Sequence, residues 1–278
     1  FSSICTQVKT IVINFNKQFV QAGFDAINKN YSDAILDYLV KRPGEEKLVL
    51  TGNDAFSLGS VIADARVYVA YPMTPSSTVL TNLAAWQEKV GMIVRHAEDE
   101  ISVINTAIGS SFAGVRSAVG TSGGGFALMV ESVSFSGITE IPIVVFIAQR
   151  PGPATGMPTW TEQGDLLFSV YSGHGEFPKI ILAPGDNEEM IELATKAYNL
   201  ADVYQMPVIV MSDMYLSESH KSVSKKFVDD FIDNYKVNRG KLVKDPSFAK
   251  ASEGKKKYLR YKIEDDGISE RLIPGTPG

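Results

Sequence analysis

Residues 66–77 read Arg66-Val67-Tyr68-Val69-Ala70-Tyr71-Pro72-Met73-Thr74-Pro75-Ser76-Ser77, an apolar run that changes into a helix start. The apolar run predicts a buried strand, and we expect Thr74 at the N-cap and Pro75 at the first helical position of the next helix. Open α/β sheets bind ligands at the carboxyl ends of their strands, so the Thr74 hydroxyl is a candidate group for holding a substrate oxygen. Thr-Pro-Ser-Ser also caps helices that have no site, and on these residues alone that simpler reading stays open.

Strand and helix patterns alternate on both sides of this stretch, from residue 47 to residue 216. Short and almost wholly apolar strands are expected at residues 47–50, 66–71, 92–95, 116–119, 142–148, 179–183 and 207–212. Helices are expected between them at residues 54–63, 76–90, 99–113, 124–135 and 187–203. This order predicts an α/β fold, a parallel sheet with helices on both faces.

The regions on either side of this domain have a different character. Residues 1–46 hold an apolar run at 10–15 that is typical of a short strand, a helical pattern around Phe19 and a second helical pattern at 32–40. Residues 217–278 are rich in charge, which favours a solvated linker with one or two amphipathic helices over a nucleic-acid patch. From the two ends we expect a piece of a longer polypeptide, with a processed start and a loose tail as the alternative.

Composition excludes several classes of protein. The chain has 278 residues, 44% hydrophobic and 21% charged, with a net charge of −5, so no general basic field favours nucleic acid or an anionic membrane. We see neither an apolar run long enough to span a bilayer nor a signal peptide. The single cysteine, Cys5, cannot form an internal disulfide, a cysteine-based zinc site or an iron–sulfur cluster. We therefore expect a cytoplasmic enzyme or enzyme subunit with no metal site of its own.

Three carboxyl groups follow the third expected strand, in the run from His96 to Glu100. Glu98 and Asp99 suit the first turn of a helix because they interact favourably with its dipole. Glu100 differs, since the apolar positions that follow it indicate a face turned toward the interior. A partly buried carboxyl can exchange a proton near neutrality, so Glu100 is a candidate acid–base group.

Two loops later in the chain combine glycine with polar residues. The run Gly120-Thr121-Ser122-Gly123-Gly124-Gly125-Phe126 lacks the spacing of a nucleotide-phosphate loop, and it predicts a turn with close backbone contacts. Arg150 follows a buried strand, where its guanidinium could capture a carboxylate with two hydrogen bonds or simply pair with an acid such as Glu140. His174 lies between two glycines and is interpreted as a loop residue.

Together these motifs resemble the α subunit of 2-oxoacid:ferredoxin oxidoreductases, which are thiamine diphosphate enzymes. The resemblance runs from about residue 51 to residue 218 and includes residues 71–77, 97–100, 121–126, 149–153 and 173–178. Met73 departs from the isoleucine that is usual in the family, and Ala154 departs from a frequent serine. Motifs this numerous and in the right order make a chance similarity improbable.

The resemblance implies that residues 47–216 form the pyrimidine-binding domain of a thiamine diphosphate fold. It assigns Glu100 to ring nitrogen N1′ of the cofactor as the catalytic carboxyl. It assigns Thr74 and Arg150, with Thr155, to substrate binding. It places the cofactor beside the remaining expected binding residues, which are Tyr71, Pro72, Gly123 and Gly124.

The resemblance also accounts for motifs that this sequence lacks. We find neither the Gly-Asp-Gly and paired-asparagine signature for magnesium and diphosphate nor a cysteine cluster. In the family, Mg²⁺ and a [4Fe-4S] cluster belong to a separate β subunit, so we expect a dimer of heterodimers with thiamine diphosphate shared between chains. The reaction implied is oxidative decarboxylation of a 2-oxoacid to acyl-CoA, with coenzyme A as acceptor and electrons passing to ferredoxin.

The flanking regions resemble parts of the same family. Residues 1–46 are similar to the end of a fused γ domain with its linker, and residues 217–278 to a charged connector toward a second α domain that is missing here. Two alternative functions remain: a non-oxidative thiamine diphosphate decarboxylase or transketolase-like subunit, and a non-catalytic assembly module.

Overall fold

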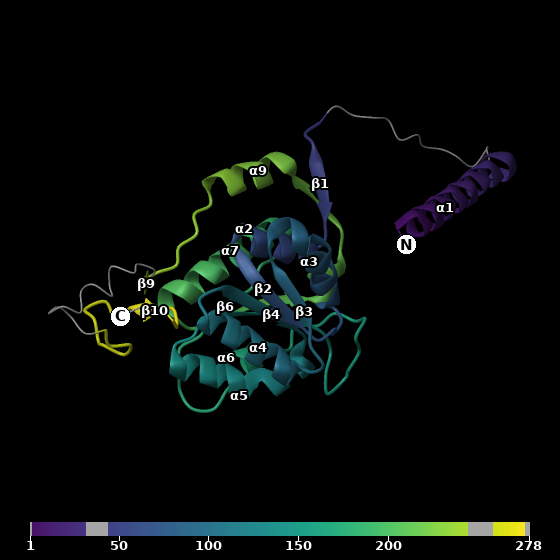
Figure 1. Ribbon diagram of the computed structural model, residues 1–278. Helices are drawn as coiled ribbons and strands as arrows, with labels where there is room; N and C mark the ends of the chain where they lie inside the picture. The colour runs from purple at the N-terminus through teal and green to yellow at the C-terminus, as the bar shows by residue number, and fades with distance from the viewer. Residues whose placement is uncertain (1, 32–43, 244–257, 276–278) are drawn as a thin grey trace. The chain divides into compact units, whose positions relative to one another are not determined.

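The computed structural model describes residues 2–31, 44–243 and 258–275, and the chain divides into two compact units, Phe1–Gly44 and Glu45–Gly278. The described part of the first unit is one helix, α1 (Ser2–Tyr31) (Figure 1). The strand expected at residues 10–15 is therefore wrong, because this run continues the apolar stripe of α1 and Phe15 meets Phe19 edge-on one turn later. The helix expected at 32–40 lies outside the described residues. Neither α1 nor any other described helix is long and apolar enough to cross a lipid bilayer.

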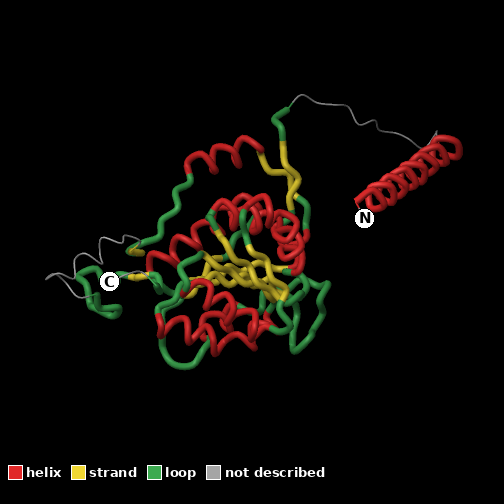
Figure 2. Tube along the Cα trace, in the orientation of Figure 1, coloured by secondary structure: helices red, strands yellow, loops and turns green. Residues whose placement is uncertain are grey.

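A six-stranded parallel sheet forms the centre of the second unit (Figure 2). Its strands are β2 (Ala65–Ala70), β3 (Ile93–His96), β4 (Arg116–Thr121), β5 (Ile143–Gln149), β6 (Ile180–Leu182) and β7 (Pro207–Asp213). The order across the sheet is β3-β2-β4-β5-β7-β6, which confirms the predicted parallel α/β fold. The chain reverses its direction across the sheet between β2 and β4, and such a reversal opens a crevice at the carboxyl ends of the two strands.

Helices cover both faces of this sheet (Figure 1). The helices α2 (Gly52–Ile62), α3 (Ser77–Val90) and α7 (Asn187–Tyr204) pack on one face. The other face carries α4 (Glu100–Phe112) and α5 (Gly123–Thr139), with the short α6 (Leu166–Tyr171) beside them. The sequence analysis missed α6 because six residues are too few to show a helical period.

Alternate residues of each strand enter two separate cores. In β5, Val144 and Phe146 face α2 and α7, whereas Val145 and Ile147 face α4 and α5. Phe146 stacks on Phe56 of α2 with ring centroids 4.3 Å apart. Because both faces are buried, the strands are apolar at nearly every position, which is why their sequence pattern was clear.

The first expected strand lies outside the parallel sheet. β1 (Lys47–Leu50) pairs antiparallel with β8 (Lys221–Ser224), which follows the short helix α8 (Met214–Glu218). Only one face of β1 is covered, since Lys47 and Val49 are exposed while Leu48 and Leu50 are partly buried. The two strands that flank residues 51–220 are thus joined to each other.

The described part of the charged tail packs on the domain and differs from the expected solvated linker. The predicted amphipathic helix is present as α9 (Lys225–Asn234), and its apolar face of Phe227, Val228 and Phe231 belongs to the same hydrophobic cluster as α2 and α7. Further along, β9 (Leu242–Val243) pairs in parallel with β10 (Arg271–Leu272). The apolar residues of α9 recur at intervals of three and four residues, so they share one face of the helix. This spacing makes α9 pack on the domain although the region is highly charged.

A buried carboxylate joins the tail to the sheet. The Asp202 side chain, 3% exposed, accepts hydrogen bonds from Arg116 Nε at 2.7 Å and Arg271 Nη2 at 3.0 Å, and it forms an ion pair with Arg239, whose Nε lies 2.6 Å away. Arg116 begins β4, whereas Arg239 and Arg271 come from the tail. A buried charge of this kind is stable only while its partners remain, because an unpaired charge away from water is costly.

We predict that Asp202→Asn lowers the free energy of unfolding by about 3–5 kcal/mol, because it leaves buried guanidinium groups without their counter-charge. Denaturant unfolding of the chain measures this change. The matched control is Asp64→Asn, which breaks the exposed ion pair with Arg66 and should cost about 0–1 kcal/mol. Equal losses in the two variants would contradict the assigned role of Asp202.

Candidate active site

The loops named by the sequence analysis meet at one edge of the sheet. Residues 71–76 follow β2, residues 97–99 follow β3 and residue 122 follows β4, at the crevice where the chain changes direction. Residues 150–165 follow β5, the next strand along. Strands that run parallel bring their carboxyl ends to the same edge, so loops far apart in sequence become neighbours.

The turn after β2 leaves the Thr74 side chain unengaged. The expected N-cap role of Thr74 is wrong, because α3 begins at Ser77 with Ser76 as its N-cap. Ser76 donates to the Met73 carbonyl from its backbone nitrogen at 2.9 Å and from its hydroxyl at 2.7 Å, and this turn delays the helix. Within the described residues, the half-buried Thr74 side chain makes no hydrogen bond. Its hydroxyl is therefore available to a ligand.

Glu100 is the first residue of α4 and is turned into the protein, as the sequence indicated. Asp99 forms the N-cap and accepts from the Ser102 backbone nitrogen at 2.7 Å, which leaves Glu100 to point inward at 5% exposure. Its Oε1 atom is buried and has no hydrogen-bond partner among the described residues. A buried carboxyl oxygen without a partner is costly, so this atom is a strong candidate for contact with a bound group.

The three glycines at the start of α5 each make room for a different polar group. A Cβ on Gly125 would lie 2.6 Å from Glu100 Oε1, and it would come even closer to Thr121 Oγ1. A Cβ on Gly124 would lie 3.1 Å from the Ala154 carbonyl oxygen. A Cβ on Gly123 would lie 2.7 Å from Asp165 Oδ1. The predicted close-contact turn is therefore confirmed, and it brings these groups to the first turn of α5.

Helix α5 also begins without a side-chain cap. Its N-cap residue, Ser122, makes no capping hydrogen bond, and its hydroxyl has no partner among the described residues. The backbone nitrogens of a helix's first turn have no acceptor within the helix and carry a partial positive charge. Polar groups of a ligand or of a second chain can therefore be held at this position.

Arg150 lies against the turn that carries Thr74. Its Nη1 donates to the Thr74 carbonyl oxygen at 2.6 Å, and partial burial lowers the pKa of the guanidinium. The alternative partner Glu140 instead pairs with Arg260 at 2.8 Å, so that interpretation is wrong. No acceptor in the described part of the chain engages Arg150 Nε or Nη2. These nitrogens remain to bind a carboxylate next to the Thr74 hydroxyl.

The other expected binding residues lie at the rim of this site. Tyr71 is 38% exposed and meets His96 edge-on, with ring centroids 6.1 Å apart, and the neighbouring Pro72 is exposed. Thr155 is exposed and follows Ala154, whose carbonyl touches the start of α5. His174 donates its backbone nitrogen to Ser134 Oγ at 2.6 Å, in keeping with a loop residue. The part of the chain that the structure describes holds no His, Cys, Asp or Glu cluster placed to ligate a metal.

Asp165 is a site residue that the sequence analysis missed. It precedes α6, its Oδ2 is buried without a partner among the described residues, and its backbone nitrogen donates to Gln149 Oε1 at 2.9 Å. Burial raises the pKa of this carboxyl, and the nearby Glu162 raises it further. No local pattern marked Asp165, because its approach to Gly123 depends on how a loop after β5 folds back.

This arrangement defines an α/β domain with a candidate ligand site at the carboxyl edge of its parallel sheet. Residues 59–265 match the family described as pyruvate flavodoxin/ferredoxin oxidoreductase, thiamine diphosphate-binding. The chain belongs to this family, and the resemblance drawn from its motifs is confirmed.

Several relatives agree with this assignment. The chain is 38% identical over 274 residues to the α subunit of 2-oxoacid:ferredoxin oxidoreductase 1 of Sulfurisphaera tokodaii, covering 94% of this chain and 41% of that protein. It is 38% identical over 179 residues to a 2-oxoglutarate synthase subunit of Archaeoglobus fulgidus, covering 64% of this chain and 52% of that subunit. The chain thus spans about two fifths of the length of the first of these relatives.

A solved structure has the same fold. It is a 2-oxoglutarate:ferredoxin oxidoreductase from Magnetococcus marinus with 2-oxoglutarate, coenzyme A and succinyl-CoA bound. The TM-score is 0.77 at 35% identity, and the match covers 86% of this chain and 40% of that chain.

We predict that Gly125→Ala weakens thiamine diphosphate binding by at least about tenfold in the assembled enzyme, because the new methyl group displaces the Glu100 carboxyl. Calorimetric titration of the cofactor measures the effect. The matched control is Gly109→Ala on α4, because a Cβ there would meet no atom within 4 Å. This variant should leave the free energy of unfolding unchanged or raise it by about 0.5–1 kcal/mol. Unchanged cofactor affinity in Gly125→Ala would argue against this placement of Glu100.

Proposed function

We propose that this chain supplies the aminopyrimidine-binding half of a thiamine diphosphate site in a 2-oxoacid:ferredoxin oxidoreductase. The reaction is oxidative decarboxylation of a 2-oxoacid to an acyl-CoA, with the electrons passing to ferredoxin. The observation that carries the proposal is the buried Glu100 carboxyl, whose Oε1 lacks a partner among the described residues at the crevice between β2 and β4.

The described residues fit the aminopyrimidine ring of the cofactor. A flat heterocycle with a ring nitrogen would provide the partner that Glu100 Oε1 lacks among the described residues. Gly123 and Gly124 would border the ring, with Tyr71 and Pro72 at the rim. When bound, thiamine diphosphate supplies a nucleophilic carbon and accepts the electron pair released on loss of carbon dioxide. Glu100 holds and moves a proton at the ring nitrogen.

Thr74 and Arg150 form the substrate side of the site. Arg150 Nε and Nη2 bind the carboxylate of the 2-oxoacid, because a planar guanidinium matches a carboxylate with two parallel hydrogen bonds. The Thr74 hydroxyl donates to the keto oxygen, and Thr155 closes the site from the loop after β5. The hydrogen bond from Arg150 to the Thr74 carbonyl keeps these two groups together.

A partner chain completes the site. Large apolar side chains are exposed on α4, α5 and α6, among them Ile101, Leu128 and Leu167. These helices lie together on one face of the sheet (Figure 1). The rings of Phe126 in α5 and Phe168 in α6 contact each other edge-on, with their centroids 5.3 Å apart. Exposed apolar surface of this kind marks protein contacts. We infer that a β subunit covers it, contributes Mg²⁺, the diphosphate site and a [4Fe-4S] cluster, and forms a dimer of heterodimers, so that this chain alone is inactive.

The same observation argues against the assembly-module alternative. In a module kept only for assembly, nothing would offset the cost of a buried carboxyl oxygen that lacks a hydrogen-bond partner among the described residues. The residues before 47 and after 216 are proposed to be the end of a γ domain and a connector toward a second α domain.

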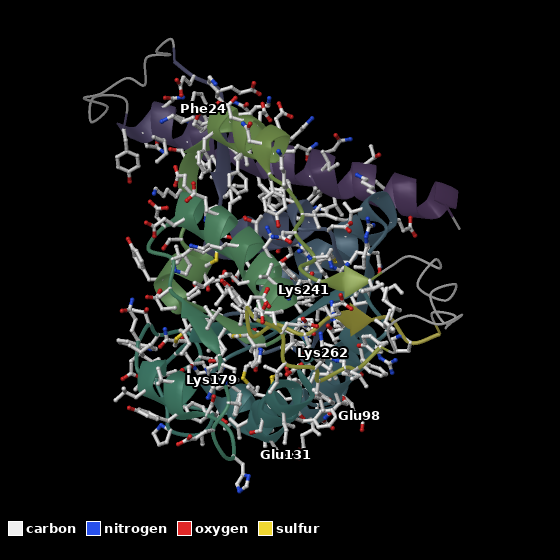
Figure 3. The ribbon with its side chains drawn as sticks, turned by 90° about the vertical axis from the view of Figure 1, so that its left-hand side faces the viewer. Phe24, Glu98, Glu131, Lys179, Lys241 and Lys262 are labelled. Atoms are coloured by element: carbon white, nitrogen blue, oxygen red, sulfur yellow. The ribbon has the colours of Figure 1, made fainter. Side chains whose placement is uncertain are left out.

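We predict that Glu100→Gln in the assembled enzyme lowers 2-oxoacid-dependent reduction of ferredoxin by about 10²–10⁴-fold, because the amide cannot exchange the proton. Glu98→Gln is the matched control, since this neighbouring carboxyl is exposed at the surface (Figure 3) and should keep wild-type turnover. Near wild-type turnover of Glu100→Gln with cofactor bound would overturn the assigned mechanism. Release of free aldehyde without reduced ferredoxin would favour the non-oxidative alternative.

We predict that Arg150→Ala raises KM for the 2-oxoacid by at least about tenfold while cofactor affinity stays within about threefold of wild type. Arg150→Lys keeps the charge but loses the paired geometry, so its KM should lie between those of the wild type and Arg150→Ala. Steady-state kinetics with cofactor titration separates the two effects. An unchanged KM in Arg150→Ala would leave Arg150 with a structural role only.

A further inference from the structure

The side chain of Asn53 lies directly behind the turn that carries Thr74. Asn53 is the second residue of α2 and is fully buried. Its Nδ2 atom donates to the Pro75 carbonyl oxygen at 2.7 Å and lies 2.5 Å from Thr78 Oγ1 and 3.2 Å from Glu218 Oε1. One amide group therefore joins the turn after β2 to helices α2, α3 and α8.

The partners of Asn53 decide the orientation of its amide. The Pro75 carbonyl can only accept a hydrogen bond, so the amide must present its nitrogen to it. The carboxylate of Glu218 likewise accepts and favours the same orientation. Aspartate at this position would bring an oxygen against two acceptors, and leucine would offer no donor.

Three consecutive carbonyl groups of the turn are held in this way. The Met73 carbonyl accepts from Ser76, the Thr74 carbonyl accepts from Arg150 at 2.6 Å, and the Pro75 carbonyl accepts from Asn53. The Thr74 side chain makes no hydrogen bond within the described residues. The backbone of the turn is thus fixed, while the Thr74 hydroxyl is left available.

We propose that Asn53 is a positioning residue that fixes the position of the Thr74 hydroxyl relative to the 2-oxoacid. Glu218 contacts the Asn53 amide and holds it in its orientation. The inference rests on the proposed function in one respect, the contact of Thr74 with substrate. Asn53 itself acts through the Pro75 carbonyl and touches neither substrate nor cofactor. Loss of the amide leaves a buried carbonyl without a donor, and the turn must shift to satisfy it.

The segment that carries Glu218 is tied closely to the start of α2. A Cβ on Gly52 would lie 2.9 Å from the Leu216 carbonyl carbon, so the two backbones pack without a side chain between them. β1 and β8, the strands just before α2 and just after α8, pair with each other. The paired segments next to α2 and α8 therefore help to hold Asn53 and Glu218 behind the turn.

The test compares Asn53→Ala with wild type in the assembled enzyme, and Glu218→Ala serves as a milder second variant because Glu218 is only half-buried. A misplaced hydroxyl weakens substrate binding, so KM for the 2-oxoacid should rise on the order of tenfold to hundredfold in Asn53→Ala. A smaller rise is expected in Glu218→Ala. The kcat value and the thiamine diphosphate dissociation constant should stay within about threefold of wild type.

The matched control is Asn82→Ala. Asn82 on α3 donates to Asp54 Oδ1 at 2.7 Å and so binds the same first turn of α2 without reaching Pro75. Its variant should keep the wild-type KM. A purely structural role for Asn53 would lower the melting temperature and the active fraction, and hence the apparent kcat, while KM stayed unchanged.

A crystal structure of the Asn53→Ala complex supplies a readout independent of turnover. Displacement of residues 74–75 together with a raised KM supports the inference. An undisturbed turn, or a wild-type KM in both Asn53→Ala and Glu218→Ala, overturns it while the proposed function stands. If the wild-type complex shows no 2-oxoacid-dependent reduction of ferredoxin, the proposed function fails. The positioning role of Asn53 is then tested only by whether residues 74–75 move in the crystal structure of the variant.

Discussion

The Glu100 carboxyl can be buried at the carboxyl edge of the sheet only because residue 125 has no side chain. A single methyl group there would lie 2.6 Å from Glu100 Oε1. Through this close approach the carboxyl reaches the first turn of α5, and its Oε1 is left without a partner among the described residues. Such an arrangement costs stability in the isolated chain, and a bound heterocycle would recover that cost.

Around this contact, the parallel sheet brings four loops to a single edge. The crevice between β2 and β4 exists because the chain first adds β3 outside β2 and then crosses to the other side. Glu100 and Thr74 therefore come from opposite layers of the domain, since α4 and α3 cover different faces. Arg150 bridges the loops after β5 and β2 by donating to the Thr74 carbonyl, so the two groups proposed for substrate are held together.

The domain is also closed by its own entry and exit segments. β1 pairs with β8, α9 covers the core, and Asp202 binds arginines from the sheet and from the tail. High charge in residues 217–278 had indicated a solvated linker, but charge content does not show where the charges lie. Arg239 and Arg271 are drawn inward by one buried carboxylate, and Phe227 and Phe231 fall on one face of a helix.

The sequence by itself determined the α/β class, most strand and helix positions, and the candidate residues Thr74, Glu100 and Arg150, because buried parallel strands are apolar at nearly every position and the motifs are local. Tertiary structure alone decided that β1 leaves the sheet, that α3 begins at Ser77, and that Arg150 contacts Thr74 instead of Glu140. It also revealed Asp165 and Asn53, whose roles depend on contacts with residues far away in the chain. A local pattern records which face of an element is buried, whereas the partner of a polar side chain is set only when distant segments pack together.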